Sequence, residues 1–174
     1  MTERVILVDE HDRELGTEEK ERAHREGRLH RAFSVFVFDS GGRLLLQRRA
    51  RTKYHSAGLW TNTCCSHPRP GEGVPAAAAR RLREEMGMEC ALRPSFPLLY
   101  RAELDRGMTE HEYDHVLVGE CDRDPVPDPA EVEEWAWVSP AALRREVERR
   151  PEAYTYWFRL ALPELLDRLE RRAG

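Results

Sequence analysis

Residues 60–87 bring together the side chains of this sequence that are best suited to chemistry. Cys65 and His67 stand two positions apart in a polar loop, and Arg81 and Glu85 stand four positions apart in the expected helix that follows. Side chains four positions apart on a helix project from one face, so this guanidinium and this carboxylate would lie together. A thiol, an imidazole, a carboxylate and a guanidinium within one strand–loop–helix unit suit a metal ion and a phosphorylated ligand better than they suit a plain surface.

Histidine and glutamate residues form a second group with metal-binding potential. The chain has 7 histidines, and a single histidine is more often a surface or hydrogen-bonded core residue than a metal ligand. Glu110 and Glu112 stand two positions apart at the mouth of an expected strand, so their side chains would point to the same side. Three imidazoles with these two carboxylates would suit a divalent transition metal ion such as Mn²⁺ or Zn²⁺. The candidate ligands are His24, His30, His67, Glu110 and Glu112.

Cys65 is the candidate nucleophilic or acid–base thiol. Buried free cysteines are usually inert small apolar residues. Cys65, however, lies two positions from a candidate metal ligand in a polar loop beside basic residues, and these conditions can favour a thiolate. Cys64 would face the other way if the segment is extended.

A further charged group lies on the expected helix and just before it. Charge alone favours a solvated helix with ion pairs between residues four positions apart. The spacing nevertheless resembles a Nudix box, whose helix carboxylates hold Mg²⁺ against a diphosphate. The chain has Ser66 where the hydrolase motif opens with Gly, and Arg81 where the motif follows Arg with Glu. A cation in place of a metal-binding carboxylate favours diphosphate binding over diphosphate hydrolysis. The residues of this group are Glu72, Arg80, Arg81, Glu84 and Glu85.

Length and composition narrow the class of protein. A chain of 174 residues with 40% hydrophobic residues is typical of one globular domain. A net charge of −4 argues against nucleic acid as the main partner. The sequence has no apolar run near the ~18 residues of a membrane span and no signal-peptide pattern. The 4 cysteines do not form a disulfide framework, which favours the reducing cytoplasm. Only Lys20 and Lys53 of the 28 basic residues are lysines. Their compact charge suggests a specific use for them, and their presence by chance is an equally good explanation.

Propensities and turn signals predict elements that would position these residues. The central helix would open after Gly73 with Pro75 in its first turn and stop at Gly87, and Leu82 with Met86 would pack inward. A first helix would start at Thr17 as N-cap and run through His24, and a last helix would begin near Pro151. The last helix carries a core face at Phe158, Leu162, Leu165, Leu166 and Leu169. Strands are expected at 4–8, 32–38, 43–47, 111–121 and 134–138, with one or two more within 89–103 and a helix from Ser139-Pro140 to about 149.

Short motifs along nearly the whole chain resemble the type 1 isopentenyl-diphosphate isomerases, which use a Nudix fold. They are EEK at Lys20, AH at His24, RLH at His30, RRARTK at 48–53, WTNTCCSHP at 60–68, GE at Glu72, RRLREEMG at 80–87, YRA at Tyr100, TEHE at 109–112 and YTYWF with Trp157. The resemblance implies an α/β fold, with a mixed sheet sandwiched by helices, in a single domain over 1–174. Residues 1–30 would be an N-terminal extension with metal ligands, 31–148 the Nudix core, and 150–174 a C-terminal helix.

The same resemblance implies roles for individual residues. The five candidate ligands match the family's Mn²⁺ or Zn²⁺ site, and Glu85 with the backbone carbonyl of Cys65 matches its Mg²⁺ site for the diphosphate. Cys65 matches the catalytic thiol, while Glu112 and Tyr100 match the acid–base group on the opposite face of the substrate. The residues that match the diphosphate clamp are Lys20, Arg49, Lys53 and Arg81.

The implied reaction moves the double bond of isopentenyl diphosphate to give dimethylallyl diphosphate. Protonation of the terminal carbon forms a tertiary carbocation, and loss of a proton from C2 on the other face completes the shift. Trp157 would stabilise the cation through its aromatic face, or it would be an ordinary core residue. The implied partner is this small diphosphate in the cytoplasm, without nucleic acid or membrane, and the chain would act as a monomer or a homodimer.

Two other functions remain open from the sequence. One is a Nudix hydrolase of nucleoside diphosphate derivatives, against which Arg81 speaks. The other is a binding domain without enzymatic activity, in which the His/Glu cluster holds a metal for structure alone. Loss or retention of function on replacing Cys65 would distinguish the isomerase from this last class.

Overall fold

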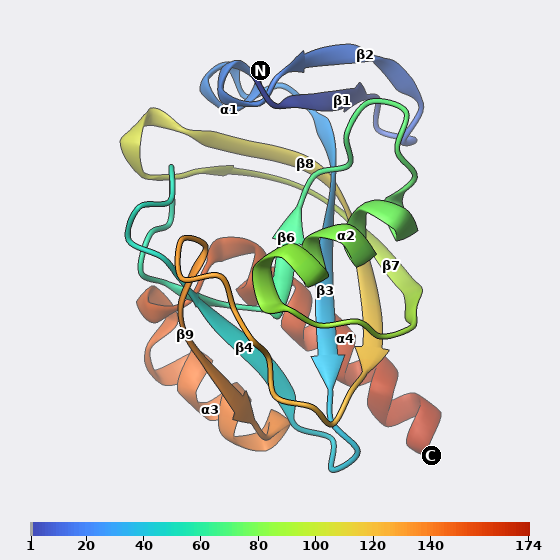
Figure 1. The fold of residues 1–174 in the computed structure, drawn as a ribbon, viewed down its shortest axis with the longest axis vertical. Coiled ribbons are helices and arrows are strands. Elements are labelled where there is room, and N and C mark those ends of the chain that lie inside the picture. The colour runs from blue at the N-terminus through green and yellow to red at the C-terminus, as the bar shows by residue number, and fades with distance from the viewer. Residues whose placement is uncertain (1) are drawn as a thin grey trace.

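A computed structural model describes residues 2–174. Within that range nine strands form one mixed sheet, and helices cover both of its faces, with α2 in front and α4 behind in Figure 1. The strands are β1 (Arg4–Val8), β2 (Glu14–Glu19), β3 (His30–Phe38), β4 (Leu44–Arg49), β5 (Trp60–Thr61), β6 (Cys64–Ser66), β7 (Leu92–Glu103), β8 (Thr109–Glu120) and β9 (Val132–Val138). The helices are α1 (Lys20–Glu26), α2 (Val74–Met86), α3 (Pro140–Arg149) and α4 (Tyr156–Ala173), with short 3₁₀ turns at Asp105–Gly107 and Pro151–Ala153. The expected α/β sandwich is confirmed.

Strand β3 is the central element for the site because it pairs on both sides. On one side it pairs antiparallel with β6, with Ser34 opposite Cys65. On the other side it pairs parallel with β8, with His30 opposite Glu112. Ser34 and His30 are four positions apart on one strand and therefore share a face. The register thus places Cys65 and Glu112 on opposite flanks of one strand.

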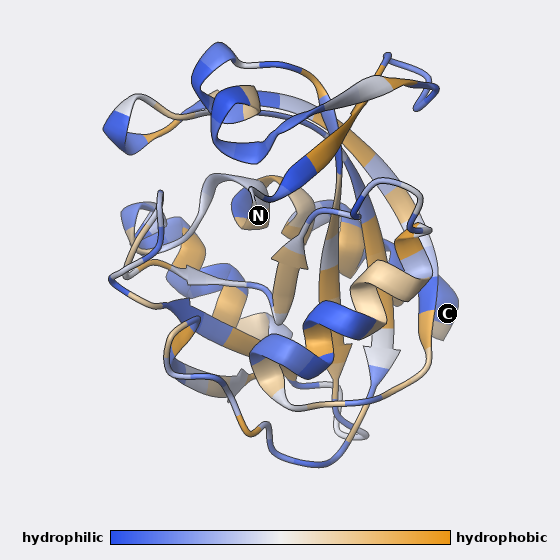
Figure 2. Cartoon of the chain, turned by 45° about the horizontal axis from the view of Figure 1, so that its top comes forward, coloured by the Kyte–Doolittle hydropathy of each residue, from blue (hydrophilic) through white to orange (hydrophobic). Residues whose placement is uncertain are grey.

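Alternation along β3 divides the core into two layers. Phe33, Val35 and Val37 pack with Cys64 and α2 on one face. Phe36 and Phe38 pack on the other face with α3 and α4. Helix α4 contributes the predicted apolar stripe, which consists of Phe158, Leu162, Leu165 and Leu166, with Leu169 half-buried beside them. In Figure 2 the central strands are coloured mainly hydrophobic, whereas α2 alternates between hydrophilic and apolar segments. This two-sided burial is what a sheet between two helical layers requires.

Helix α2 has the boundaries that the sequence predicts. Gly73 is its N-cap, Pro75 lies in the first turn, and Gly87 ends it in the left-handed conformation at φ 60°. Leu82 and Met86 are buried as predicted. Two backbone hydrogen bonds, from Val126 and Asp128 to the carbonyls of Met86 and Glu85, fasten the loop before β9 to the end of this helix.

The first and last helices begin later than the sequence indicates. Thr17 does not cap a helix, because it belongs to β2, lies opposite Ile6 of β1 and accepts a hydrogen bond from Arg4. α1 therefore begins at Lys20 and runs to Glu26, two residues beyond the expected His24, with Gly27 as its C-cap. Pro151 opens only a 3₁₀ turn, and α4 begins at Tyr156 after Thr155. Pairing with β1 outweighs the local capping signal at Thr17.

Segment 89–103 forms one strand with an irregularity between Pro94 and Phe96, not two strands.

Within residues 2–174 none of the helices is long and apolar enough to cross a membrane.

We predict that Gly87→Ala destabilises the protein more than Gly42→Ala. Both glycines have positive φ, which costs an L-residue about 1–2 kcal/mol. A Cβ at Gly42 would meet nothing within 4 Å, whereas a Cβ at Gly87 would lie 2.5 Å from the carbonyl oxygen of Val126. The loop must then shift, so we expect an additional loss of at least about 1 kcal/mol. Urea unfolding followed by circular dichroism measures both variants, and equal losses would contradict the close approach.

We also predict a pH-dependent loss of stability for Glu72→Gln. Two hydrogen bonds of 2.8 Å from Arg80 to Glu72 tie the loop before α2 to that helix. This contact lowers the pKa of Glu72 from 4.5 to about 2. Because the folded-state pKa is below the unfolded value, the pair stabilises the fold above about pH 4.5 and loses this effect as pH falls toward 2.

The ion pair is partly open to solvent, so we expect Glu72→Gln to cost only about 1–2 kcal/mol at pH 7. The difference from the wild type should narrow steadily between pH 5 and pH 3. Chemical denaturation across this pH range provides the measurement. A difference that does not change with pH would show that the carboxylate charge is unimportant.

Candidate active site

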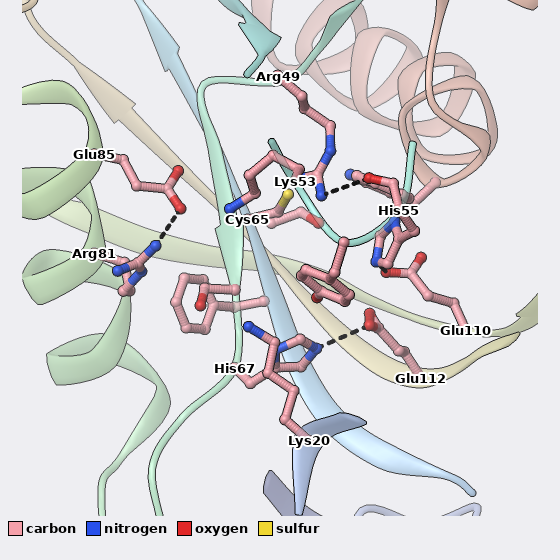
Figure 3. A pocket seen from close by; sticks show the side chains of 15 residues that line it. Lys20, Arg49, Lys53, His55, Cys65, His67, Arg81, Glu85, Glu110 and Glu112 are labelled. Atoms are coloured by element: carbon pink, nitrogen blue, oxygen red, sulfur yellow. Dashed lines mark hydrogen bonds and ion pairs between the residues drawn. The ribbon is translucent and has the colours of Figure 1, made fainter. Parts of the chain in front are cut away.

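A cavity lies where β3, β6 and β8 meet α2 and the start of α4 (Figure 3). Basic and acidic side chains line it together with one thiol and a few aromatic rings. The lining residues are Lys20, Phe33, Ser34, Arg49, Lys53, Tyr54, His55, Cys65, Ser66, His67, Arg81, Glu85, Glu110, Glu112 and Trp157.

Three histidines surround Glu112 at one end of this cavity. Its Oε1 atom lies 3.0 Å from Nε2 of His67, 3.4 Å from Nε2 of His30 and 4.0 Å from Nε2 of His24. The Nδ1 atoms of His24 and His30 are tied to backbone carbonyls, at 2.7 Å from Lys20 and 2.8 Å from Arg28. These bonds direct Nε2 of both rings toward the carboxylate.

Glu110 belongs to a second, overlapping group. His24, His55 and Glu110 each offer a donor atom within 4.8 Å of the others, as do His24, His30, His67 and Glu112. Nε2 of His55 is 3.4 Å from Oε1 of Glu110. His24 therefore links the two carboxylates, and all four histidines are buried.

The donor set fits a divalent metal ion. Among residues 2–174, Nε2 of His24, His30 and His55 and Nδ1 of His67 are buried without a hydrogen-bond partner. Buried polar atoms are rarely left unpaired, and a cation held between them would satisfy the Nε2 atoms and the carboxylates together. In metal-binding histidines the other ring nitrogen usually donates to a carbonyl, as in His24 and His30.

The protonation states of most of these candidate ligands also fit a bound metal ion. Burial lowers the pKa of His24 to about 4 and that of His67 well below its usual value, so both rings are neutral at pH 7. Burial alone would raise the pKa of Glu112, but the hydrogen bond and charge of His30 outweigh it and lower the pKa. Neutral imidazoles and an ionised carboxylate are the forms that bind metals. The same pairing raises the pKa of His30 against the effect of burial.

Tyr100 lies behind the carboxylates and does not line the cavity. Its hydroxyl donates to Oε2 of Glu110 at 2.9 Å and to Oε2 of Glu112 at 3.2 Å. Burial raises the pKa of Tyr100 well above its usual value, so the phenol remains a donor. The predicted placement of both carboxylates on one side of their strand is confirmed, since one hydroxyl reaches both.

Cys65 and Cys64 face opposite sides of β6, as predicted. Cys64 is fully buried in the core under α2, whereas Cys65 lines the cavity. The expectation of a thiolate at Cys65 is wrong for this structure. Burial raises the pKa of Cys65 far above its usual range, although the charge of Arg49 opposes this effect. The raised pKa favours the protonated thiol, although the side chain is only half-buried.

The four predicted clamp residues all line the cavity, and three of them are held by carboxylates. Lys20 pairs with Glu3 at 3.0 Å. Arg81 lies 2.5 Å from Glu85 and 3.5 Å from Glu131, and Lys53 pairs with Glu131 as well. In Figure 3 the Arg81–Glu85 pair lies on the α2 side of the cavity, away from His67 and Glu112.

Arg49 differs from the other clamp residues because it is held by a carbonyl. Its Nη2 donates to the carbonyl of His55 at 3.1 Å, and its guanidinium lies 5.3 Å from the ring of Trp157. Its Nε has no hydrogen-bond partner within the described chain. Part of this cation is thus free to bind an anion in the cavity.

Glu85, the predicted Mg²⁺ ligand, is buried at the α2 edge of the cavity. Its Oε1 accepts from Arg81 and its Oε2 from Nε2 of Gln47, at 3.1 Å. A hard carboxylate oxygen beside the cationic cluster is of the type that Mg²⁺ prefers.

Trp157 projects from the first turn of α4 into the cavity and is 2% exposed. Its indole N–H donates to Oδ1 of Asn62 at 3.2 Å, and its ring meets that of His55 edge-on, with centroids 5.7 Å apart. Trp157 therefore packs in the interior and also forms a wall of the cavity.

The remaining charged residues of the helix lie outside the cavity. Glu72 binds Arg80, and Glu84 pairs with both Arg80 and Arg81. The solvated helix with ion pairs is thus the correct description of Glu72, Arg80 and Glu84, whereas Arg81 and Glu85 point into the site.

Every site residue predicted from the sequence lies in or directly behind this one cavity. His24, His30 and Tyr100 form the layer behind it, and the others line it. Sequence reasoning missed His55, Tyr54, Gln47 and Glu131. Only His55 had a usable signal in the sequence, since it follows Lys53 by two positions in the basic and aromatic loop before residues 60–87.

Comparisons with known proteins agree with this geometry. The family model described as NUDIX domain matches residues 28–158. The chain is 55% identical to isopentenyl-diphosphate Delta-isomerase 1 of Aromatoleum aromaticum, over 95% of this chain and 94% of that protein. It is 56% identical to isopentenyl-diphosphate Delta-isomerase of Burkholderia multivorans, over 91% of this chain and 90% of that protein.

Solved structures support the fold. DR0079 from Deinococcus radiodurans superposes with a TM-score of 0.78 at 22% identity, covering 93% of this chain and 98% of that chain. The MutT protein from Methanosarcina mazei gives a TM-score of 0.64 at 22% identity, covering 82% and 95%. With relatives above half identity along nearly their full length, the chain belongs to the isopentenyl-diphosphate Delta-isomerase family and carries its NUDIX domain.

Proposed function

We propose that this protein interconverts isopentenyl diphosphate and dimethylallyl diphosphate, in isoprenoid biosynthesis, through the cavity between β6 and β8. One observation carries the proposal. A thiol and a buried carboxylate, Cys65 and Glu112, reach one cavity from opposite flanks of β3, and four basic side chains line the same cavity. The identity to proteins that bear the isomerase name supports it.

The diphosphate would bind among Lys20, Arg49, Lys53 and Arg81. Their charges suit a polyanion, and the unpaired Nε of Arg49 offers a donor that already points into buried space. Binding energy from this remote group would hold the five-carbon chain against the reacting side chains. Glu85 and the backbone carbonyl of Cys65 would hold Mg²⁺ beside the diphosphate, where the ion would neutralise phosphate charge.

The cluster of His24, His30, His67, Glu110 and Glu112 would hold Mn²⁺ or Zn²⁺. An ion there would polarise the carboxyl group of Glu112 and fix its orientation. Tyr100 would complete the arrangement by donating to both carboxylates from behind.

Proton transfer would occur between the substrate and two groups on opposite faces. In the direction of dimethylallyl diphosphate, the terminal carbon gains a proton, C3 becomes cationic, and C2 loses a proton as the new double bond forms. Glu112, relayed by Tyr100, would serve one face, and Cys65 would serve the other. The two groups exchange roles in the reverse direction, so no external acid or base is consumed.

The tertiary cation needs stabilisation without a nucleophile that would trap it. The ring of Trp157 would supply an aromatic face, worth about 0.5–2 kcal/mol for a desolvated cation. Its hydrogen bond to Asn62 and the edge-on contact with His55 would fix the ring plane. Its burial would also keep water away from the reacting carbons.

All of these residues come from one chain, so the site needs no partner subunit and a monomer would be active. Within the described residues the 4 cysteines are all free, which fits the reducing cytoplasm.

We expect the purified protein with Mg²⁺ and Mn²⁺ to convert isopentenyl diphosphate into dimethylallyl diphosphate. In D₂O the product should carry deuterium, which proton NMR and mass spectrometry detect. Removal of metals with a chelator should abolish turnover, and their return should restore it, because the buried carboxylates need a cation. Phosphate release from nucleoside diphosphate derivatives, without isomer formation, would identify a hydrolase instead.

We expect Cys65→Ala to fold and bind metal but to lose turnover by about 10²–10⁴-fold, as for removal of an acid–base group. The substitution keeps the backbone carbonyl, so the Mg²⁺ site remains. Cys90→Ala, at a half-buried cysteine outside the cavity lining, is the matched control and should retain activity. Full turnover by Cys65→Ala would contradict the assignment. Loss of the bound metal together with activity would contradict a specific acid–base role of Cys65.

A further inference from the structure

His55 is a buried histidine that lines the cavity and has no role in the reaction described above. It is 1% exposed, and its Nε2 has no hydrogen-bond partner within the described chain. A buried histidine with one unpaired nitrogen needs a reason, because desolvation of that atom is costly. Its nearest charged neighbour is Oε1 of Glu110, at 3.4 Å.

His55 has the same arrangement as two of the proposed metal ligands. In His24 and His30, Nδ1 is tied to a carbonyl oxygen while Nε2 points at a glutamate oxygen. In His55, Nδ1 lies 3.1 Å from the hydroxyl of Ser56 while Nε2 points at Glu110. A fixed Nδ1 and a free Nε2 aimed at carboxylates are typical of imidazoles that bind a metal ion.

The other histidines of the chain differ in this respect. Nδ1 of His111 is likewise tied to a carbonyl, that of Gly27 at 3.1 Å, but within the described residues its ring has no carboxylate partner. Nε2 of His115 lies 2.9 Å from Asp12, and this ring is only half-buried. His11 is largely exposed and lies 3.7 Å from Glu10. The arrangement is thus confined, among the residues described, to the rings around Glu110 and Glu112.

His24 connects both groups of donors but has only one free nitrogen. Its Nδ1 is engaged by Lys20, so Nε2 is its single donor atom, and this atom can bind only one ion. The two groups share this atom, although their donors do not all lie within 4.8 Å of one another, so a single ion bound to it would lie between the two groups. Their union contains four imidazoles and two carboxylates, namely His24, His30, His55, His67, Glu110 and Glu112.

We propose that His55 is a ligand of this metal site, which gives the ion six protein donors. Six donors exceed the four that Zn²⁺ takes in closed protein sites, and they suit an ion that accepts octahedral coordination, such as Mn²⁺. The proposal rests on the His/Glu cluster being the metal site of the proposed isomerase. The proposal also accounts for Glu110, since His55 and His24 would hold the ion beside this carboxylate.

A structure of the Mn²⁺-loaded protein tests the proposal directly. Anomalous scattering at the manganese edge locates the ion, and Nε2 of His55 should lie within roughly 2.0–2.4 Å of it, as ligand nitrogens do. A distance beyond 3 Å, with the other five donors bound, would overturn the proposal and leave His55 as a hydrogen-bond partner of Glu110. The measurement uses the wild-type protein and does not depend on any variant folding.

The affinity of the protein for Mn²⁺ provides a second test. His55→Phe keeps a ring against Trp157 but removes both nitrogens, and we expect its dissociation constant for Mn²⁺ to rise at least about tenfold in a titration followed by electron paramagnetic resonance. His115→Phe, at a half-buried histidine that is also paired with a carboxylate, is the matched control and should bind as the wild type does. Equal affinity of all three proteins would overturn the proposal. If His55→Phe does not fold, His55→Gln takes its place.

Assays on the same preparations separate this proposal from the proposed function. Isomerase turnover by a wild-type protein whose ion is not bound to His55 overturns only the role of His55. An ion bound to His55 without any turnover overturns only the isomerase assignment.

Discussion

The burial of two neighbouring carboxylates is the constraint on which the site depends. Glu110 and Glu112 are each 4% exposed on the same face of β8. Ionised carboxylates at such depth are stable only with cations or strong donors around them. The parallel pairing of β3 with β8 places His30 beside Glu112, and α1 adds His24. Residues 2–30 therefore contribute to the site, because they supply His24 and His30 beside the buried carboxylate pair.

The opposite end of the cavity carries an ion-pair network. Arg81 pairs with Glu84, Glu85 and Glu131, and Lys53 pairs with Glu131 as well, so the two cations are fixed in place by three carboxylates. The His/Glu cluster and this network thus lie at different ends of the cavity (Figure 3). The diphosphate head of the proposed substrate would meet basic side chains, while its alkene would lie near the carboxylates. The protonated thiol of Cys65 lies between the two ends, where burial keeps it neutral.

Local signals in the sequence were sufficient for much of this arrangement. The ends of α2, the inward position of Leu82 and Met86, and the shared side of Glu110 and Glu112 follow from spacing alone. What could not be predicted depends on contacts distant in sequence. Thr17 lies in a strand because β1 pairs with it, and Glu131 reaches Lys53 across 78 positions. The thiolate prediction for Cys65 was wrong because burial depends on the whole fold, whereas the basic neighbours were visible locally.

Two of the helices that reach the cavity, α1 and α2, share one geometry. In α1, Lys20 and His24 are four positions apart, and the carbonyl of Lys20 holds the imidazole while its ammonium group enters the cavity. In α2, Arg81 and Glu85 are four positions apart and pair directly. One helical turn thus joins a proposed phosphate-binding cation to a proposed metal-binding group in each case. A shift of either helix would therefore move both groups together, and the loop hydrogen-bonded to the carbonyls of Glu85 and Met86 secures the end of α2.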